Sequence, residues 1–258
     1  MNERVIIVIP ARWGSVRYPG KPLVPIAGVP MIVRVARRAQ MVRSAGEVLV
    51  ATDDERIRTV VEAEGIRAVM TRTDHANGSE RIAEAVQSVG GSEIVVNVQG
   101  DEPLLDPATV DLLIAALRAD PALGCATPVA PITSVEELLS PSVVKTVVRN
   151  DGDALYFSRS PIPSVRDLPE ERWPTLGRHL RHIGIYAYRW PALQRLVASP
   201  PSPLETCEQL EQLRLLSLGE RIRCCPVLHS GHGVDTPEDR ERVEQIILAE
   251  KQTIQEQR

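Results

Sequence analysis

The chain has 258 residues, of which 43% are apolar and 25% charged, a globular composition that excludes disordered and fibrous proteins. A net charge of −4 and only eight aromatic residues argue against a nucleic-acid binder that uses a basic face or base stacking. No apolar run approaches the roughly 20 residues that span a bilayer, and no signal-peptide pattern precedes the first apolar run, so we expect a cytoplasmic protein.

The N-terminal half alternates short apolar runs with helical patterns. Strands are predicted at 5–9, 47–51, 67–70 and 93–98, and helices at 30–42, 53–65 and 78–89. A helix at 106–119 and a strand at 125–132 continue the series. Such alternation with short links is typical of βαβ units. It predicts an α/β fold with a mostly parallel central sheet and helices on both faces.

The alternation of strands and helices ends after residue 140. Two strands are predicted around the Asp-Gly turn at 151–152, followed by a loop at 161–178 with four prolines and a strand at 182–189. A helix at 202–214, a strand at 221–228 and a helix from Pro237 complete the chain. We expect a single domain over 1–258, with an inserted substrate and dimerisation lobe at about 142–225.

The segment PARWGSVRYPGKP (10–22) follows the first strand and carries Arg12, Arg17 and Lys21. It is not a Walker A loop, because five residues instead of four separate its two glycines, and a proline follows the lysine. No G-x-G-x-x-G fingerprint occurs in the strand-to-helix turns. A cationic, glycine-bearing loop at the end of the first strand predicts a polyphosphate site. The alternative is a solvated basic turn, but three prolines stiffen the loop.

The segment VNVQGDEP (96–103) places Asp101 after a buried strand, at the edge of the sheet where the cationic loop is expected. A carboxylate among cations and phosphates is typical of a magnesium site, since Mg²⁺ uses one or two carboxylates and otherwise substrate phosphates and water. Asp101 or Glu102 could instead cap the helix that starts near Asp106.

The segment GHGVDTPEDRERV (231–243) begins a helix, with Thr236 as the cap, proline at the first position and Asp239 at the third. This accounts for Thr236 and Asp239 as structural residues. It does not account for Asp235, which is therefore a candidate second ligand of the metal.

In SPLETCEQLEQLR (202–214), Ser202 and Glu205 form a capping box. Helical spacing puts Glu208, Glu211 and Gln212 on one face. Such a face is either solvated or functional, and the pattern alone leaves both interpretations open.

Seven segments, in this order and over nearly the whole chain, together resemble the 3-deoxy-manno-octulosonate (Kdo) cytidylyltransferases, or CMP-Kdo synthetases: IPARWGSVRYPGKPL, DHANGSER, VNVQGDEP, ALYFSR, HIGIYAYR, SPLETCEQLEQLR and GVDTPEDRERV. The resemblance implies a Rossmann-like nucleotidyltransferase fold with a small dimerisation lobe, and a homodimer. It also implies magnesium as cofactor and CTP and Kdo as substrates, with CMP-Kdo for lipopolysaccharide biosynthesis and pyrophosphate as products.

The same resemblance implies residue roles. Catalytic roles fall to Arg12, Lys21, Asp101 and Asp235, and magnesium to Asp101 and Asp235. Nucleotide contacts fall to Ala11, Arg12, Lys21, His75, Ser79, Arg81 and Gln99. Sugar-acid contacts fall to Gln99, Arg159, His182, Tyr186, Glu211 and Gln212. The chain departs from the family pattern at Trp13, Tyr18, Asn77 and Ser79, and none of these departures removes a charge or a ligand.

Three alternatives remain open. The substrate could be another keto-acid, such as sialic acid or an 8-amino analogue of Kdo. The chain could be a nucleotide-binding protein without catalytic activity, although the presence of Arg12, Lys21, Asp101 and Asp235 argues against that. A nucleic-acid interface rests only on Arg34, Arg37, Arg38 and Arg43, which are expected on the exposed side of the helix at 30–42.

Overall fold

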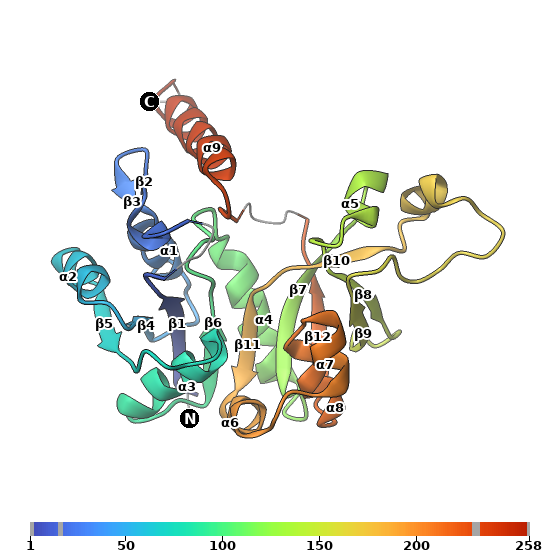
Figure 1. Cartoon of the computed structure of the whole chain (residues 1–258), viewed down its shortest axis with the longest axis horizontal. Helices are drawn as coiled ribbons and strands as arrows, with labels where there is room; N and C mark the ends of the chain where they lie inside the picture. Colours follow the sequence, from blue (N-terminus) through green and yellow to red (C-terminus); the bar gives the residue numbers. More distant parts are fainter. Residues whose placement is uncertain (1–2, 15–17, 229–232, 257–258) are drawn as a thin grey trace. The chain divides into compact units, whose positions relative to one another are not determined.

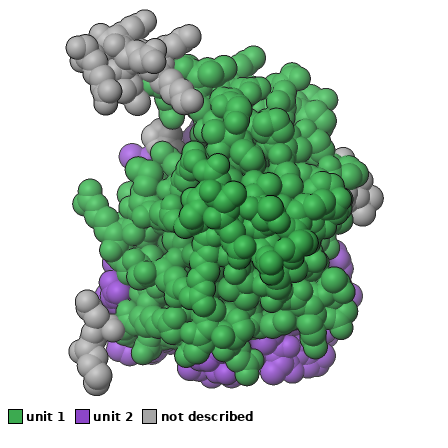
Figure 2. Space-filling model, turned by 90° about the vertical axis from the view of Figure 1, so that its left-hand side faces the viewer, with its two compact units in different colours: residues 1–111, 231–258 green, residues 112–230 purple. Residues whose placement is uncertain are grey.

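The computed structural model describes residues 3–14, 18–228 and 233–256. The chain forms two compact units, residues 1–111 with 231–258, and residues 112–230. Figure 1 traces the elements in chain order, and Figure 2 colours both stretches of the first unit green. The first unit therefore takes its residues from both ends of the chain.

The first unit is built on a parallel sheet. Its elements are β1 (Val5–Ala11), η1 (Lys21–Leu23), β2 (Pro25–Ile26), β3 (Val29–Pro30), α1 (Met31–Ala39), β4 (Glu47–Thr52), α2 (Glu55–Ala63), β5 (Arg67–Met70), α3 (Gly78–Ser88), β6 (Ile94–Asn97) and α9 (Pro237–Glu256). Strands β5, β4, β1 and β6 pair in this order, all in parallel. Residues 5–9 of β1 are at most 2% exposed, as expected for a parallel strand covered on both faces. The predicted α/β fold, with a mostly parallel central sheet flanked by helices, is confirmed (Figure 1).

Polar caps start the helices that follow the strands. Asp54 caps α2 by accepting the backbone amide of Arg56, and Asn77 caps α3 by accepting that of Glu80. The helix α4 (Pro107–Ala119), within which the boundary between the units falls, begins after Asp106, whose carboxylate accepts the amide of Ala108 at 3.1 Å. Asp106 therefore caps α4, the role that Asp101 or Glu102 was considered for as an alternative to metal binding.

A small apolar cluster fixes the C-terminal segment in the first unit. It consists of Ile26, Met31, Val234, Val243 and Ile247, and so joins the β2–β3 hairpin to the residues before and within α9. The cluster holds the chain immediately before Asp235 in place. The predicted cap at the start of α9 is present, because Thr236 and Asp239 exchange hydrogen bonds.

Of the four arginines expected on the exposed side of the helix, Arg37 and Arg43 are exposed, and Arg37 pairs with Glu64. Arg34 donates to the carbonyls of Ile26 and Ala27, and Arg38 donates to the carbonyl of Leu105. Both are half-buried rather than exposed, contrary to the expectation, because the helix packs closely on the hairpin and the 99–105 segment.

The second unit contains a mixed sheet. Its elements are β7 (Cys125–Pro131), α5 (Val135–Leu139), β8 (Lys145–Val148), β9 (Ala154–Ser158), η2 (Glu170–Leu176), β10 (Leu180–His182), β11 (Tyr186–Arg189), α6 (Trp190–Ala198), α7 (Pro203–Glu208), α8 (Gln212–Ser217) and β12 (Ile222–Pro226). β7 pairs in parallel with β12 and antiparallel with β10 and β11, while β8 pairs antiparallel with β10 and β9. The lobe predicted at about 142–225 falls inside this unit.

The single strand predicted at 182–189 is wrong, because the segment is divided into β10 and β11. Both halves pair with β7, and the Thr127 hydroxyl of β7 lies at the break, 3.1 Å from the carbonyl of Ile183 and 2.9 Å from that of Ile185. Between His182, opposite Val129, and Ala187, opposite Ala126, this segment advances five residues while β7 advances three, so two extra residues bulge out of the ladder and divide the strand.

The single helix predicted at 202–214 is also wrong, because it is divided into α7 and α8 at Gln209, whose φ is +54°. The capping box of Ser202 and Glu205 is present, but Glu208 ends one helix and Glu211 precedes the next, so the predicted shared face does not exist. The predicted loop at 161–178 contains the short helix η2, in which Trp173 packs with Ile132 and Leu138.

Candidate active site

A pocket of about 440 Å³ lies in the first unit, where β1 and β6 end. This volume is within the range of small-molecule sites. Its lining residues come from five segments: Pro10, Ala11 and Arg12; Lys21, Pro22 and Met31; His75, Ala76, Asn77, Gly78 and Arg81; Gln99, Gly100 and Asp101; and Asp235. Carboxyl ends of parallel strands meet at one edge of a sheet, which is where α/β folds bind ligands.

The turn after β6 requires a glycine to bring Asp101 to the pocket. A Cβ on Gly100 would stand 3.0 Å from the carbonyl oxygen of Pro10 in β1, so a larger residue would push the two strand ends apart. The amide of Val234 donates to the carbonyl of Asp101 at 2.9 Å, which places Asp235 beside Asp101. The sequence placed both aspartates near the sheet edge, and the structure gives the reason that they are neighbours.

Lys21 lies between these two carboxylates. Its Nζ donates to Oδ2 of Asp101 at 2.6 Å and to Oδ1 of Asp235 at 2.9 Å. The lysine side chain is 12% exposed, whereas those of Asp101 and Asp235 are 33% and 53% exposed. One ammonium group therefore neutralises much of the repulsion between two carboxylates that open to solvent.

The charge state of Lys21 follows from its neighbours. Burial on its own lowers the pKa of Lys21, but the charges and hydrogen bonds of Asp101 and Asp235 outweigh it and raise this pKa above its ordinary value. Lys21 is therefore a permanent cation at neutral pH. The arrangement can bind an anion at the lysine or, once the lysine moves aside, a cation at the carboxylates.

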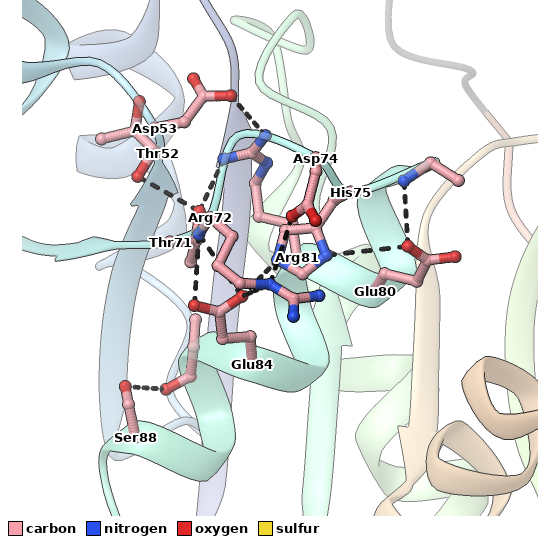
Figure 3. Close-up of polar contacts among 12 residues, drawn as sticks. Thr52, Asp53, Thr71, Arg72, Asp74, His75, Glu80, Arg81, Glu84 and Ser88 are labelled. Carbon is pink, nitrogen blue, oxygen red and sulfur yellow. Dashed lines mark hydrogen bonds and ion pairs between the residues drawn. The ribbon is translucent and has the colours of Figure 1, made fainter.

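Arg81 lines the pocket from α3 and is 4% exposed. Its guanidinium donates to Asp53 and to the Thr71 hydroxyl, both at 2.6 Å (Figure 3). A buried cation needs such partners, and together they fix the direction of the arginine. Asp53 and Thr71 escaped the sequence reasoning, because nothing local marks a carboxylate after β4 as the partner of an arginine on α3.

His75 also lines the pocket and has a buried side chain. Its Nε2 bonds to the Glu84 carboxylate, which assigns the proton to that nitrogen (Figure 3). Its Nδ1 has no hydrogen-bond partner among the described residues and lies 3.7 Å from Oε2 of Glu80. Ser79, the other residue predicted from DHANGSER, is buried on α3 and does not belong to the described lining.

The remaining nucleotide-side predictions are placed as follows. Ala11, Arg12 and Gln99 line the pocket, and Gln99 donates to Asn97 at 3.2 Å. Arg17 lies outside the described residues. The pocket lining thus includes every predicted nucleotide contact except Ser79, and the binding roles of these residues stay predictions.

The residues predicted to bind the sugar acid lie in the second unit, apart from Gln99. The Nε of Arg159 donates to the carbonyl of Glu208. Its two terminal nitrogens donate to the carbonyls of Pro141 and Gln209. Glu208, which the resemblance did not include, accepts from the Ser158 hydroxyl and from the Arg159 amide. Arg159 is therefore a clasp between β9 and the turn after α7, whatever else it binds.

His182 and Tyr186 are neighbours, with ring centroids 5.3 Å apart. Burial, helped by the charge of Arg181, lowers the pKa of His182 to about 3, and burial raises the pKa of Tyr186. Both side chains are neutral at pH 7. The Thr127 hydroxyl lies 3.0 Å from Nε2 of His182 and fixes the ring.

Gln212 begins α8 and is 4% exposed, yet its Nε2 has no hydrogen-bond partner in the described part of the chain. A buried amide without a partner costs free energy unless something accepts its protons. Glu211 precedes it as the cap residue of α8. The unsatisfied amide makes Gln212 the sugar-side residue with the clearest structural sign of a ligand.

Among the described residues no group of three or more His, Cys, Asp or Glu side chains could hold a metal ion. No helix in the described ranges is long and apolar enough to cross a bilayer.

Comparisons with known proteins agree on one family. The profile of a family described as cytidylyltransferase matches residues 6–222. A 3-deoxy-manno-octulosonate cytidylyltransferase of Verminephrobacter eiseniae is 48% identical, with 96% of each chain covered, and one of Escherichia coli is 47% identical, with 96% of this chain and 98% of that one covered. The solved structure of a CMP:2-keto-3-deoxy-manno-octonic acid synthetase complexed with CTP is 47% identical, covers 96% of this chain and 99% of its own, and superposes with a TM-score of 0.90.

Proposed function

The chain belongs to the 3-deoxy-manno-octulosonate cytidylyltransferase family, and from this premise we propose that it activates Kdo with CTP, giving CMP-Kdo and pyrophosphate. The observation that carries the proposal is Lys21 between Asp101 and Asp235, in a pocket lined by most of the residues predicted to bind nucleotide. The turn at Gly100 and the segment before α9 are both needed to bring the two carboxylates to Lys21, which distinguishes this group from an ordinary surface salt bridge.

In the proposed reaction, the anomeric hydroxyl oxygen of Kdo attacks the α-phosphorus of CTP. The bond from that phosphorus to the bridging oxygen of the β-phosphate breaks, pyrophosphate leaves, and the hydroxyl proton goes to solvent. Such transfers need positioning and charge neutralisation rather than a covalent nucleophile. Arg12 and Lys21 supply the charge for the triphosphate and for the departing pyrophosphate.

The two aspartates fit a magnesium ion. Each contributes a carboxylate oxygen, the ligand that Mg²⁺ prefers, and the two oxygens that Lys21 joins are no more than 5.5 Å apart. Two carboxylates with substrate phosphates suffice for Mg²⁺, so the absence of a third protein ligand among the described residues is compatible with this role. When bound, the ion would lower the pKa of the attacking hydroxyl and offset charge on the α-phosphate.

On the sugar side, Arg159, His182, Tyr186, Glu211 and Gln212 are proposed to bind the keto-acid. A guanidinium suits the carboxylate of Kdo, and the Nε2 of Gln212, which has no hydrogen-bond partner among the described residues, suits a hydroxyl acceptor. The neutral His182 and Tyr186 offer hydrogen bonds and ring faces without adding charge beside an anion.

The test is pyrophosphate release from CTP and magnesium with each of three acids: Kdo, its 8-amino analogue and sialic acid. We expect Kdo to give the highest kcat/KM. A clear preference for another acid would reassign the substrate within the same chemistry. Binding of CTP without turnover of any acid would support the alternative of a catalytically silent protein.

The family also leads us to propose a cytoplasmic homodimer that serves lipopolysaccharide biosynthesis, with the lobe at 142–225 in the dimer contact. Sedimentation equilibrium of the full chain tests the dimer. A monomer at micromolar concentration would contradict it.

A further inference from the structure

Trp13 connects the two flanks of the cationic segment. It follows Arg12, and its carbonyl accepts the backbone amide of Gly20 at 3.2 Å. Its ring covers Gly20 so closely that a Cβ there would stand 3.0 Å from the indole. Gly20 has a φ of +70° and precedes Lys21, so both its conformation and its contact with the ring require glycine. Trp13 therefore links the residue next to Arg12 with the residue next to Lys21, the two predicted phosphate-binding cations.

Arg56 stacks on the ring of Trp13. Its guanidinium carbon lies 3.4 Å from the centroid of Trp13, the distance of a stacked cation–π contact. Asp54 orients the guanidinium through two hydrogen bonds of 2.9 and 2.6 Å, and the same carboxylate caps α2. The start of α2 thus fixes Arg56, Arg56 fixes the ring, and the ring fixes Gly20.

We propose that Trp13, clamped by Arg56, is a positioning residue that sets the separation of Arg12 and Lys21 for the β- and γ-phosphates of the nucleotide. The inference rests on the proposed function of these two cations. Trp13 is one of the departures from the family pattern, and the clamp explains how a bulky aromatic residue is accommodated there. Neither Trp13 nor Arg56 needs to touch the substrate for this role.

The proposal predicts that loss of the clamp changes the affinity for CTP but not the affinity for CMP. Loss of the clamp misplaces the groups that bind the outer phosphates, so the affinity for CTP should fall, whereas the affinity for CMP, which lacks those phosphates, should not. A merely structural role would weaken both nucleotides together. The comparison of CTP with CMP therefore separates positioning from general damage to the pocket.

The experiment measures Kd for CTP and CMP by calorimetry, with melting temperatures, for wild type, Trp13→Ala, Trp13→Phe and Arg56→Met. An exposed cation–π contact supports an increase of about two- to fivefold in the CTP Kd for Arg56→Met, with CMP unchanged within twofold. Trp13→Ala should raise the CTP Kd further, and Trp13→Phe, which keeps an aromatic face, should recover most of the affinity. Arg58→Met is the matched control, because Arg58 lies on the same helix and pairs with Glu55.

Equal weakening of CTP and CMP, or equal effects of Arg56→Met and Arg58→Met, would overturn the inference. Lys21→Met serves as the second arm. If it weakens CTP while the Trp13 and Arg56 variants do not, only the clamp is refuted; if it leaves CTP binding unchanged, the proposed phosphate site itself fails. Arg56→Met keeps the test decisive should Trp13→Ala fold poorly.

Discussion

Replacing Lys21 with methionine tests the centre of the proposed site. The change keeps an unbranched apolar side chain, one atom shorter, and removes the charge. In the nucleotide-free protein it leaves two carboxylates facing each other without their shared ammonium group. In the CTP complex it removes a cation from the triphosphate.

The two effects have different sizes. Asp101 and Asp235 are 33% and 53% exposed, so water screens both pairs, and each pair contributes about 1 kcal/mol or less to stability. A destabilisation of about 1 kcal/mol lowers the melting temperature of a chain of this size by roughly 2–4 °C. A charge-assisted hydrogen bond to phosphate is worth about 1.5–3 kcal/mol, which corresponds to roughly a tenfold to hundredfold rise in the CTP Kd.

Calorimetric titration with CTP and magnesium measures the affinity, and thermal unfolding measures the stability. Arg37→Met is the control, because Arg37 pairs with Glu64 on an exposed surface. Manganese added without nucleotide should bind Lys21→Met more tightly than wild type, since the internal cation no longer competes for the carboxylates. A variant with a normal melting temperature and an unchanged CTP Kd would refute the reasoning.

Three further predictions follow from other parts of the site. Asp101→Asn should lower kcat by orders of magnitude at saturating magnesium with an intact fold, and near-normal kcat would remove the metal role. Gln212→Met should raise KM for Kdo without lowering the melting temperature, because it removes a buried amide that lacks a protein partner in the described structure; a lower melting temperature with unchanged KM would show a structural role instead. Burial, with the charge of Arg181, lowers the pKa of His182 from 6.5 to about 3. Between these two pH values the unfolded chain binds a proton at this histidine that the folded chain does not bind. The free energy of unfolding should therefore fall as the pH decreases from 6.5, by up to about 1.4 kcal/mol per pH unit. Denaturation at several pH values should show a flatter slope for His182→Gln, and an unchanged slope would contradict the assignment.

The nucleotide side of the site was predictable because its residues follow strands. Arg12 comes directly after β1 and Asp101 soon after β6, and parallel strands that pair in register must end at the same edge. Position along the chain therefore predicted position in space. Asp235 was a weaker prediction, since it depends on the apolar cluster around Val234 that brings the C-terminal segment back to this edge.

Contacts made by side chains between elements were not predictable. The pair of Arg81 with Asp53 joins an α3 residue to one after β4, and the stack of Arg56 on Trp13 joins α2 to the cationic segment. Neither pair has a local signature, because each partner also fits an ordinary exposed position in its own element. The errors at 182–189 and 202–214 have the same origin. A shift in the pairing register with β7 divides the first, and a left-handed residue that is not glycine divides the second.

Arg159 shows why a residue assigned from a family pattern still has to be interpreted in the structure. A guanidinium has five N–H groups, and Arg159 donates three of them to backbone carbonyls. The carbonyls take one N–H from Nε and one from each terminal nitrogen, which leaves one N–H on each terminal nitrogen for a carboxylate. The clasp therefore does not compete with the proposed role. It fixes the guanidinium before the sugar acid arrives, so that less side-chain entropy is lost on binding.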